Sequence, residues 1–115
     1  MLPNPPTPAE QLARIAAQLG VDLDDLRAGG RPFAEARALA AYALRKTFAG
    51  LTVQYIGELL GYRDHTTVCY HLRRVGRKVE THPAFAARAR ALVPGRYRIH
   101  TQKVVVVVVA EEGAL

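Results

Sequence analysis

The chain has 115 residues, of which 50% are hydrophobic, and it carries a formal net charge of +6 at pH 7. This length and composition predict one small domain with a modest apolar core. No apolar stretch approaches the roughly 20 residues of a membrane-spanning helix, and the proline-rich start lacks the basic and apolar pattern of a signal peptide. The single cysteine, Cys69, excludes an intramolecular disulfide and fits a reducing cytosol. We therefore expect a cytoplasmic protein with no membrane partner.

The positive charge is concentrated in the second half of the chain. Residues 1–60 hold six basic and six acidic side chains, whereas residues 61–115 hold ten basic and four acidic ones. The excess begins at Arg63 and continues to Lys78. A positive stripe on one side of a small domain is typical of proteins that bind a polyanion.

The first third of the chain predicts two short helical elements and a loop. Residues 1–6 contain three prolines and are expected to be a disordered lead. A capping box that begins with Thr7 predicts the start of a helix, which ends at Gly20. An aspartate-rich segment predicts a short helical turn over 22–26, and two glycines and a proline predict a loop over 28–32.

The middle of the chain predicts four further helices. The alanine-rich segment 33–48 is the longest of the apolar periodic patterns. Two shorter patterns follow, at about 53–60 and 65–79, separated by a tight turn that contains Gly61. A last helix is expected over 83–92. The predicted fold class is all-α: a small helical bundle with a helix-turn-helix.

The tail, residues 95–115, has a different character, because the six valines of Val104–Val109 favour a strand over a helix. The strand could form a hairpin with 96–100, pair with a second copy of the chain to give a homodimer, or stay loose. The internal partner segment is short, which favours the dimer. We expect a lead over 1–6, a helix-turn-helix domain over 7–94 whose helical fold is complete without the tail, and the tail itself.

The start of the second helix of the pair carries side chains suited to reading duplex DNA. In a helix-turn-helix, the first residues of the second helix meet base edges in the major groove. Asp64 can cap that helix and accept a hydrogen bond from cytosine, and His65 can donate to a base-edge acceptor. Thr66 and Thr67 offer methyl groups for thymine and hydroxyls for phosphate. Arg63, in the turn, can pair with phosphate oxygens.

A family resemblance becomes specific at this point. Ile56-Gly57, Gly61 and the run Arg63-Asp64-His65-Thr66-Thr67-Val68 resemble the signature of the C-terminal DNA-binding domain of the bacterial replication initiator DnaA, a Trp-repressor-like helix-turn-helix. The run 37–42 is similar to the arginine-led helix that precedes the signature, and 21–26 to the acidic turn that opens the domain. The resemblance covers roughly residues 8–93.

The resemblance implies DNA contacts from the residues at matching positions: Arg37, Arg63, Asp64, His65, Thr66, Thr67, Tyr70 and Arg74. Tyr70 stands where the family commonly has a histidine, and a tyrosine can still donate to phosphate. The family also places a basic cluster in the loop before the arginine-led helix, and one of its arginines enters the minor groove. Here Gly29 best matches that position, so Arg31 is the candidate to replace it.

Other chemistries are weakly supported. His65, Cys69 and His71 are close in sequence, but the further ligands of a zinc site are not evident. The chain has no serine, no paired carboxylates in a plausible cleft and no Walker-type phosphate loop. We therefore expect a DNA-binding module without the initiator's ATPase, with no enzymatic activity, no metal and no cofactor.

The sequence thus predicts a nucleoid-associated protein that binds double-stranded DNA, at sites resembling the DnaA box, in replication initiation control or transcription regulation. The alternative is an interaction protein that contacts the replication initiator without specific DNA binding. The intact signature favours the first reading. The thinned basic loop and the added tail favour the second.

Overall fold

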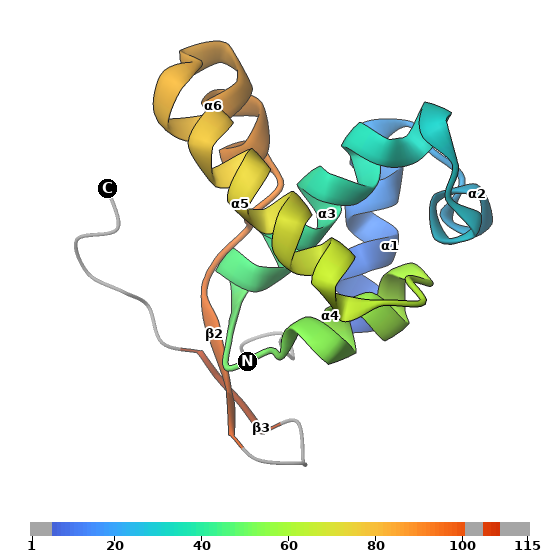
Figure 1. The fold of residues 1–115 in the computed structure, drawn as a ribbon. Coiled ribbons are helices and arrows are strands. Elements are labelled where there is room, and N and C mark those ends of the chain that lie inside the picture. Colours follow the sequence, from blue (N-terminus) through green and yellow to red (C-terminus); the bar gives the residue numbers. More distant parts are fainter. Residues whose placement is uncertain (1–5, 101–104, 109–115) are drawn as a thin grey trace.

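A computed structural model describes residues 6–100 and 105–108 of the chain (Figure 1). In chain order the elements are α1 (Pro8–Leu19), α2 (Leu23–Ala28), the 3-10 turn η1 (Arg31–Phe33), α3 (Ala34–Thr47), β1 (Phe48–Ala49), α4 (Val53–Leu60), α5 (His65–Thr81), α6 (Pro83–Ala91), β2 (Tyr97–His100) and β3 (Val105–Val108). The predicted class, a small helical bundle with a short β-forming tail, is confirmed. None of the helices in this part of the chain is long and apolar enough to cross a membrane.

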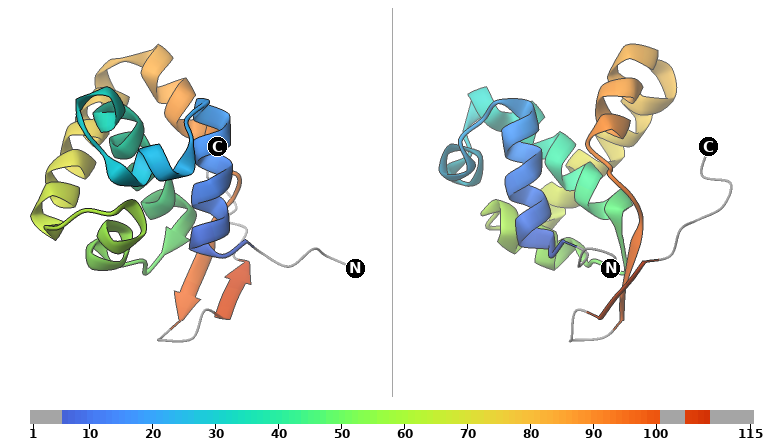
Figure 2. Two further views of the ribbon diagram at one scale, coloured as in Figure 1. Left: turned by 90° about the vertical axis from the view of Figure 1, so that its right-hand side faces the viewer. Right: turned by 180° about the vertical axis from the view of Figure 1, so that it is seen from behind.

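Helix α3 forms the centre of the bundle, and α1, α4, α5 and α6 all pack against it (Figures 1 and 2). Its small side chains let these neighbours approach closely, because an alanine adds only a methyl group to the helix surface. The buried residues of α3 are Ala38, Leu39, Ala40, Ala41, Ala43, Leu44 and Thr47. Leucines and isoleucines from the surrounding helices complete the core, among them Ile15, Ile56 and Leu60, which are fully buried. This core fixes α4 and α5 relative to the rest of the domain.

The predicted helix ends are largely confirmed, because they depend on local hydrogen bonds. The Glu10 amide donates to Thr7 Oγ1 (3.1 Å) and the Thr7 amide donates to Glu10 Oε1 (3.2 Å), which completes the capping box. Asp22 caps α2 by accepting from the Asp24 and Asp25 amides, and Thr52 caps α4 by accepting from the Tyr55 amide. Gly20 ends α1 in the left-handed region, with φ of 70°.

Several boundaries differ by one or two residues from the predicted ones. The long helix starts at Ala34, after the turn η1, and ends at Thr47, so that Phe48 is extended. The loop over 28–32 is shorter than predicted, because Ala28 still belongs to α2. Helix α5 continues two residues beyond 79. Of the predicted lead 1–6, residues 1–5 lie outside the described residues, and Pro6 is buried.

The tail forms the internal hairpin. Strand β2 pairs antiparallel with β3, with Tyr97 opposite Val108 and Arg98 opposite Val107. Strand β2 also pairs in parallel with β1, so the sheet order is β1-β2-β3 (Figure 2). The rest of the valine run and the chain beyond it lie outside the described residues. Self-association through the tail remains a prediction, and in the described part of the chain β3 has β2 as its single neighbour.

Strand β2 packs against the core, and the expectation that the helical fold is complete without the tail stays a prediction. The Tyr97 ring lies 5.6 Å from the fully buried ring of Phe48, and Ile99 also packs against the core. Gly50, with φ of 90°, passes so close to the Ile99 carbonyl that an added Cβ would lie 2.9 Å from its oxygen. Strand β2 packs there because Phe48 leaves α3 in an extended conformation and Tyr97 of β2 lies against its ring. Pro94 therefore follows the last helix and precedes residues that pack against the core.

We predict that Tyr97→Ala lowers the free energy of unfolding by about 1–3 kcal/mol, less than the full cost of removing a completely buried ring. Urea denaturation measures this loss. The matched control is Arg98→Ala, because Arg98 is the exposed neighbour on the same strand, and its substitution should cost less than about 0.5 kcal/mol. Equal effects of the two substitutions would show that β2 contributes nothing to the core.

Candidate nucleic-acid interface

Helices α4 and α5 are joined by a tight turn that only glycine can begin. Gly61 has φ of 74°, and its amide and that of Tyr62 donate to the last carbonyls of α4, the latter to Gly57 at 2.8 Å. A Cβ on Gly61 would lie 2.4 Å from the backbone carbonyl oxygen of Arg27, at the end of α2. Both the left-handed conformation and the close approach to α2 therefore require glycine. This contact sets the position at which α5 begins.

The start of α5 is held by a helix cap and a buried valine, and its polar side chains are exposed. Asp64 Oδ1 accepts a hydrogen bond from the Thr66 amide at 2.9 Å. This bond lowers the pKa of the Asp64 carboxyl below its usual value, so the group is ionised at neutral pH. Asp64, His65 and Thr66 are exposed, Thr67 is half-buried, and Val68 is fully buried in the core. The buried valine thus anchors a helix start whose polar side chains face solvent.

The remaining predicted residues of α5 lie on the same side of the helix. Thr66, Tyr70 and Arg74 are separated by four residues each, which places them on one face. Tyr70 is 55% exposed, a large value for a tyrosine, and Arg74 and the turn residue Arg63 are also exposed. Thr66, Tyr70 and Arg74 therefore share one exposed face of α5, and Arg63, Asp64 and His65 are exposed where the helix begins, whereas Thr67 is half-buried.

Arg37 is placed differently, because its guanidinium is engaged with the protein. Its Nη2 donates to the Leu60 carbonyl at 2.7 Å, and its Cζ lies 3.9 Å from the centre of the Tyr62 ring. The side chain is half-buried, and its Nε is buried without a partner among the described residues. Arg37 therefore ties α3 to the end of α4 and to the turn. A sequence cannot show these partners, which lie more than twenty positions away.

The aromatic residues behind the turn extend this packing. The Tyr62 ring lies 5.6 Å from the His71 ring, measured between centroids. Burial, followed by the charges of Arg37 and Arg74, lowers the pKa of His71, so the imidazole is neutral at pH 7. Burial raises the pKa of Tyr62. His71 thus serves as a neutral packing group beneath the exposed surface of α5.

The loop before α3 explains why glycine stands where the resemblance implies an arginine. Gly29 has φ of 80°, and a Cβ there would lie 2.3 Å from Nη1 of Arg37. A side chain at this position would displace the Arg37 guanidinium from its place beside the turn. The next basic residue, Arg31, begins η1 and is exposed. The inward conformation of Arg37 therefore depends on the absence of a side chain at Gly29.

Comparison with known proteins finds a match to the bacterial DnaA protein helix-turn-helix over residues 11–75. The chromosomal replication initiator protein DnaA of Picosynechococcus is 36% identical over 74 residues, which cover 62% of this chain and 16% of the relative. That of Roseiflexus castenholzii is 38% identical over 77 residues (65% and 16%), and that of Bifidobacterium animalis 32% over 75 residues (64% and 13%). No solved structure matches significantly.

The chain spans about a sixth of the length of the first two of these relatives. The matched segment covers more than half of the chain and includes α3, α4, the turn and the first eleven residues of α5. The chain therefore belongs to the bacterial DnaA helix-turn-helix family, which is a family of DNA-binding, non-catalytic domains.

Proposed function

We propose that the chain binds double-stranded DNA in a sequence-specific manner, at sites resembling the DnaA box, by inserting the start of α5 into the major groove. The observation that carries this proposal is the exposed helix start at Asp64, His65 and Thr66, held from below by Val68 and by the Gly61 turn. A rigid element that presents unsatisfied donors and acceptors to solvent is what reading of base edges requires.

Each exposed side chain has a chemically distinct role. The ionised Asp64 carboxylate keeps acceptor capacity beyond the Thr66 amide, so it can accept from the amino group of cytosine. His65 donates to a purine acceptor, and the Thr66 methyl packs against that of thymine. Because these groups come from consecutive residues, they read adjacent base pairs.

Phosphate contacts would come from the residues that flank this reading end. Arg63 precedes it in the turn, while Tyr70 and Arg74 follow it one and two turns along α5. Their exposed donors suit phosphate oxygens on the two sides of the groove, and they fix the register of the helix. The half-buried Thr67 hydroxyl contributes close to the helix start. Arg31, exposed before α3, is the candidate for a contact in the neighbouring minor groove.

Arg37 supports this interface as a positioning residue. Its hydrogen bond to Leu60 and its stacking on Tyr62 hold both sides of Gly61, so its loss would disturb the orientation of α5. The direct phosphate contact that the resemblance implies would require the guanidinium to leave these partners.

In the cell, binding at such sites would place the chain on the nucleoid, in control of replication initiation or of transcription. The matched relatives are named chromosomal replication initiators, and for this reason we propose sites that resemble the DnaA box. A gel shift with a DnaA-box duplex and a scrambled duplex of equal composition tests the function. Preference for the box supports the proposal. Equal or absent binding would favour the alternative, in which the chain contacts the initiator itself.

We predict that His65→Ala and Thr66→Ala reduce discrimination at the base pair that each residue reads by about 1–3 kcal/mol. Arg74→Gln should instead weaken boxed and scrambled duplexes by similar factors, because phosphate carries no sequence information. Titrations of each variant with duplexes substituted at one base pair measure the difference. The assignment of roles is wrong if all three variants lose affinity for every sequence alike.

Substitution of Arg37 distinguishes positioning from direct contact. Arg37→Lys keeps the charge but loses the planar guanidinium, which donates to Leu60 and stacks on Tyr62. We therefore expect the free energy of unfolding of the DNA-free protein to fall by about 1–2 kcal/mol. Urea denaturation measures it, with Arg14→Lys at an exposed position of α1 as the control. Unchanged stability of Arg37→Lys would contradict the positioning role.

A further inference from the structure

A groove of about 520 Å³ runs along the second half of α5, away from the residues that read bases. It begins at Tyr70 and ends where α5 meets α6, and its lining includes Arg73, Arg74, Arg77, Lys78 and His82. Of these residues, Tyr70 and Arg74 are flanking contacts of the proposed interface. The others have no role in it, and the residues from Arg77 onward lie beyond the segment that matches the family.

The groove is strongly positive. Its lining contains four cationic side chains and no carboxylate. Arg73, Arg74 and Arg77 are exposed and have no ion-pair partner among the described residues. Their charges are therefore available to a ligand.

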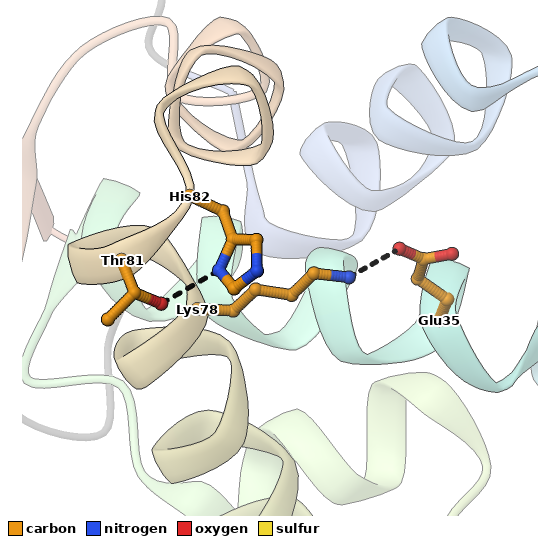
Figure 3. A network of polar contacts seen from close by, with 4 residues as sticks. All are labelled: Glu35, Lys78, Thr81 and His82. Carbon is orange, nitrogen blue, oxygen red and sulfur yellow. Dashed lines mark hydrogen bonds and ion pairs between the residues drawn. The ribbon is translucent and has the colours of Figure 1, made fainter.

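Lys78 forms one edge of the groove and is held in place by the protein. Its Nζ lies 3.6 Å from Glu35 of α3 (Figure 3) and 4.3 Å from the centre of the Phe85 ring. At the far end, Thr81 Oγ1 lies 2.7 Å from Nδ1 of His82, and Figure 3 shows this pair beside the stem of Lys78. The end of the groove is thus an ordered structure.

Repulsion between these like charges lowers the stability of helix α5. Arg73 and Arg77 are four residues apart, as are Arg74 and Lys78, and like charges at that spacing repel each other on a helix surface. A solvated face without a ligand is more stable with both signs of charge along it. Glu80, the acidic residue of α5, lies outside the lining. An anion with charges repeated along a line would remove the repulsion.

Distance separates the groove from the reading end. Arg77 follows His65 by twelve residues, which is about 18 Å along the helix axis. Because α5 is proposed to enter the major groove by its first turn, and that groove is about 12 Å wide and 8.5 Å deep, a residue about 18 Å along the helix would lie outside it. The second half of α5 would then face the surroundings of that major-groove segment.

We propose that this groove is a second DNA-binding surface, which holds a phosphodiester backbone outside the site read by the start of α5. The inference rests on the proposed function. Guanidinium groups one helical turn apart can each pair with phosphate oxygens, and the exposed Tyr70 supplies a further donor at the entrance. The backbone belongs either to the flank of the same duplex or to a second DNA segment, and the chemistry is the same for both.

The test compares two double variants of the full chain. Arg73→Gln with Arg77→Gln removes two charges from the groove, and Arg88→Gln with Arg90→Gln removes two exposed charges from α6 as the matched control. Each protein is titrated by fluorescence anisotropy, over a range of NaCl, with a boxed duplex of about one helical turn and with the same duplex extended by about one turn on each side. Thermal unfolding verifies that each variant is folded.

If the groove holds the flank of the same duplex, the groove variant loses about 1.8 from the slope of log affinity against log salt on the long duplex only. When the salt concentration rises fourfold, the affinity of the groove variant for the long duplex would therefore fall by a factor about tenfold smaller than the affinity of the native chain. If it holds a second segment, the native complex with the short duplex captures a labelled oligothymidine or a labelled unboxed duplex, and the groove variant does not. Either result supports the proposal.

The proposal is overturned if the groove variant matches the α6 control on the long duplex and in the capture assay. The proposed function fails separately, if the native chain does not distinguish the boxed short duplex from a scrambled one. Since the short duplex reports on the reading end and the other two measurements report on the groove, the two failures cannot be confused.

Discussion

The contact between Gly61 and the end of α2 is the constraint on which the rest of the interface depends. The glycine lies in the left-handed region, with no room for a Cβ against the Arg27 carbonyl, so the turn between α4 and α5 requires glycine at this position. The turn directs α5 across α3, buries Val68 and leaves the Asp64-capped helix start in solvent. Arg37 reinforces the same turn from α3, through Leu60 on one side and Tyr62 on the other.

Helix α5 combines two requirements that oppose each other. Its inner side is anchored by Val68 and Val75, which are buried in the core. Its outer side carries Arg73, Arg74 and Arg77, which have no ion-pair partner among the described residues, an arrangement that lowers helix stability and favours a polyanionic ligand. Caps and core packing therefore stabilise a helix whose exposed face is strongly positive.

The parts of this structure that depend on neighbouring residues could be predicted from the sequence, and the parts that depend on distant ones could not. The Thr7 capping box, the Gly61 turn and the helix start at Asp64 follow from side chains within four positions of each other, and they were predicted correctly. The pairing of β1 with β2 joins residues nearly fifty positions apart, and no periodicity indicates it.

The interface also has features that depend on neighbouring residues and features that depend on distant ones. The exposed reading residues follow from the motif, because the N-terminal turn of a helix after a tight turn is rarely buried. The inward conformation of Arg37 depends on the absence of a side chain at Gly29 and on the ring of Tyr62, and only the folded chain brings these three together. The groove on α5 likewise required the fold, since His82 closes its end where α5 meets α6, and Glu35 of α3 holds Lys78 at its edge.

The central claim is that the start of α5 reads base edges, and selection from a pool of random duplexes tests it most directly. Rounds of binding by the native chain, followed by sequencing, should enrich one short motif related to the DnaA box. The same selection with a chain carrying His65→Ala and Thr66→Ala should yield a motif that is degenerate at adjacent positions. Tight binding that enriches no motif, or an identical motif from both proteins, would contradict the account.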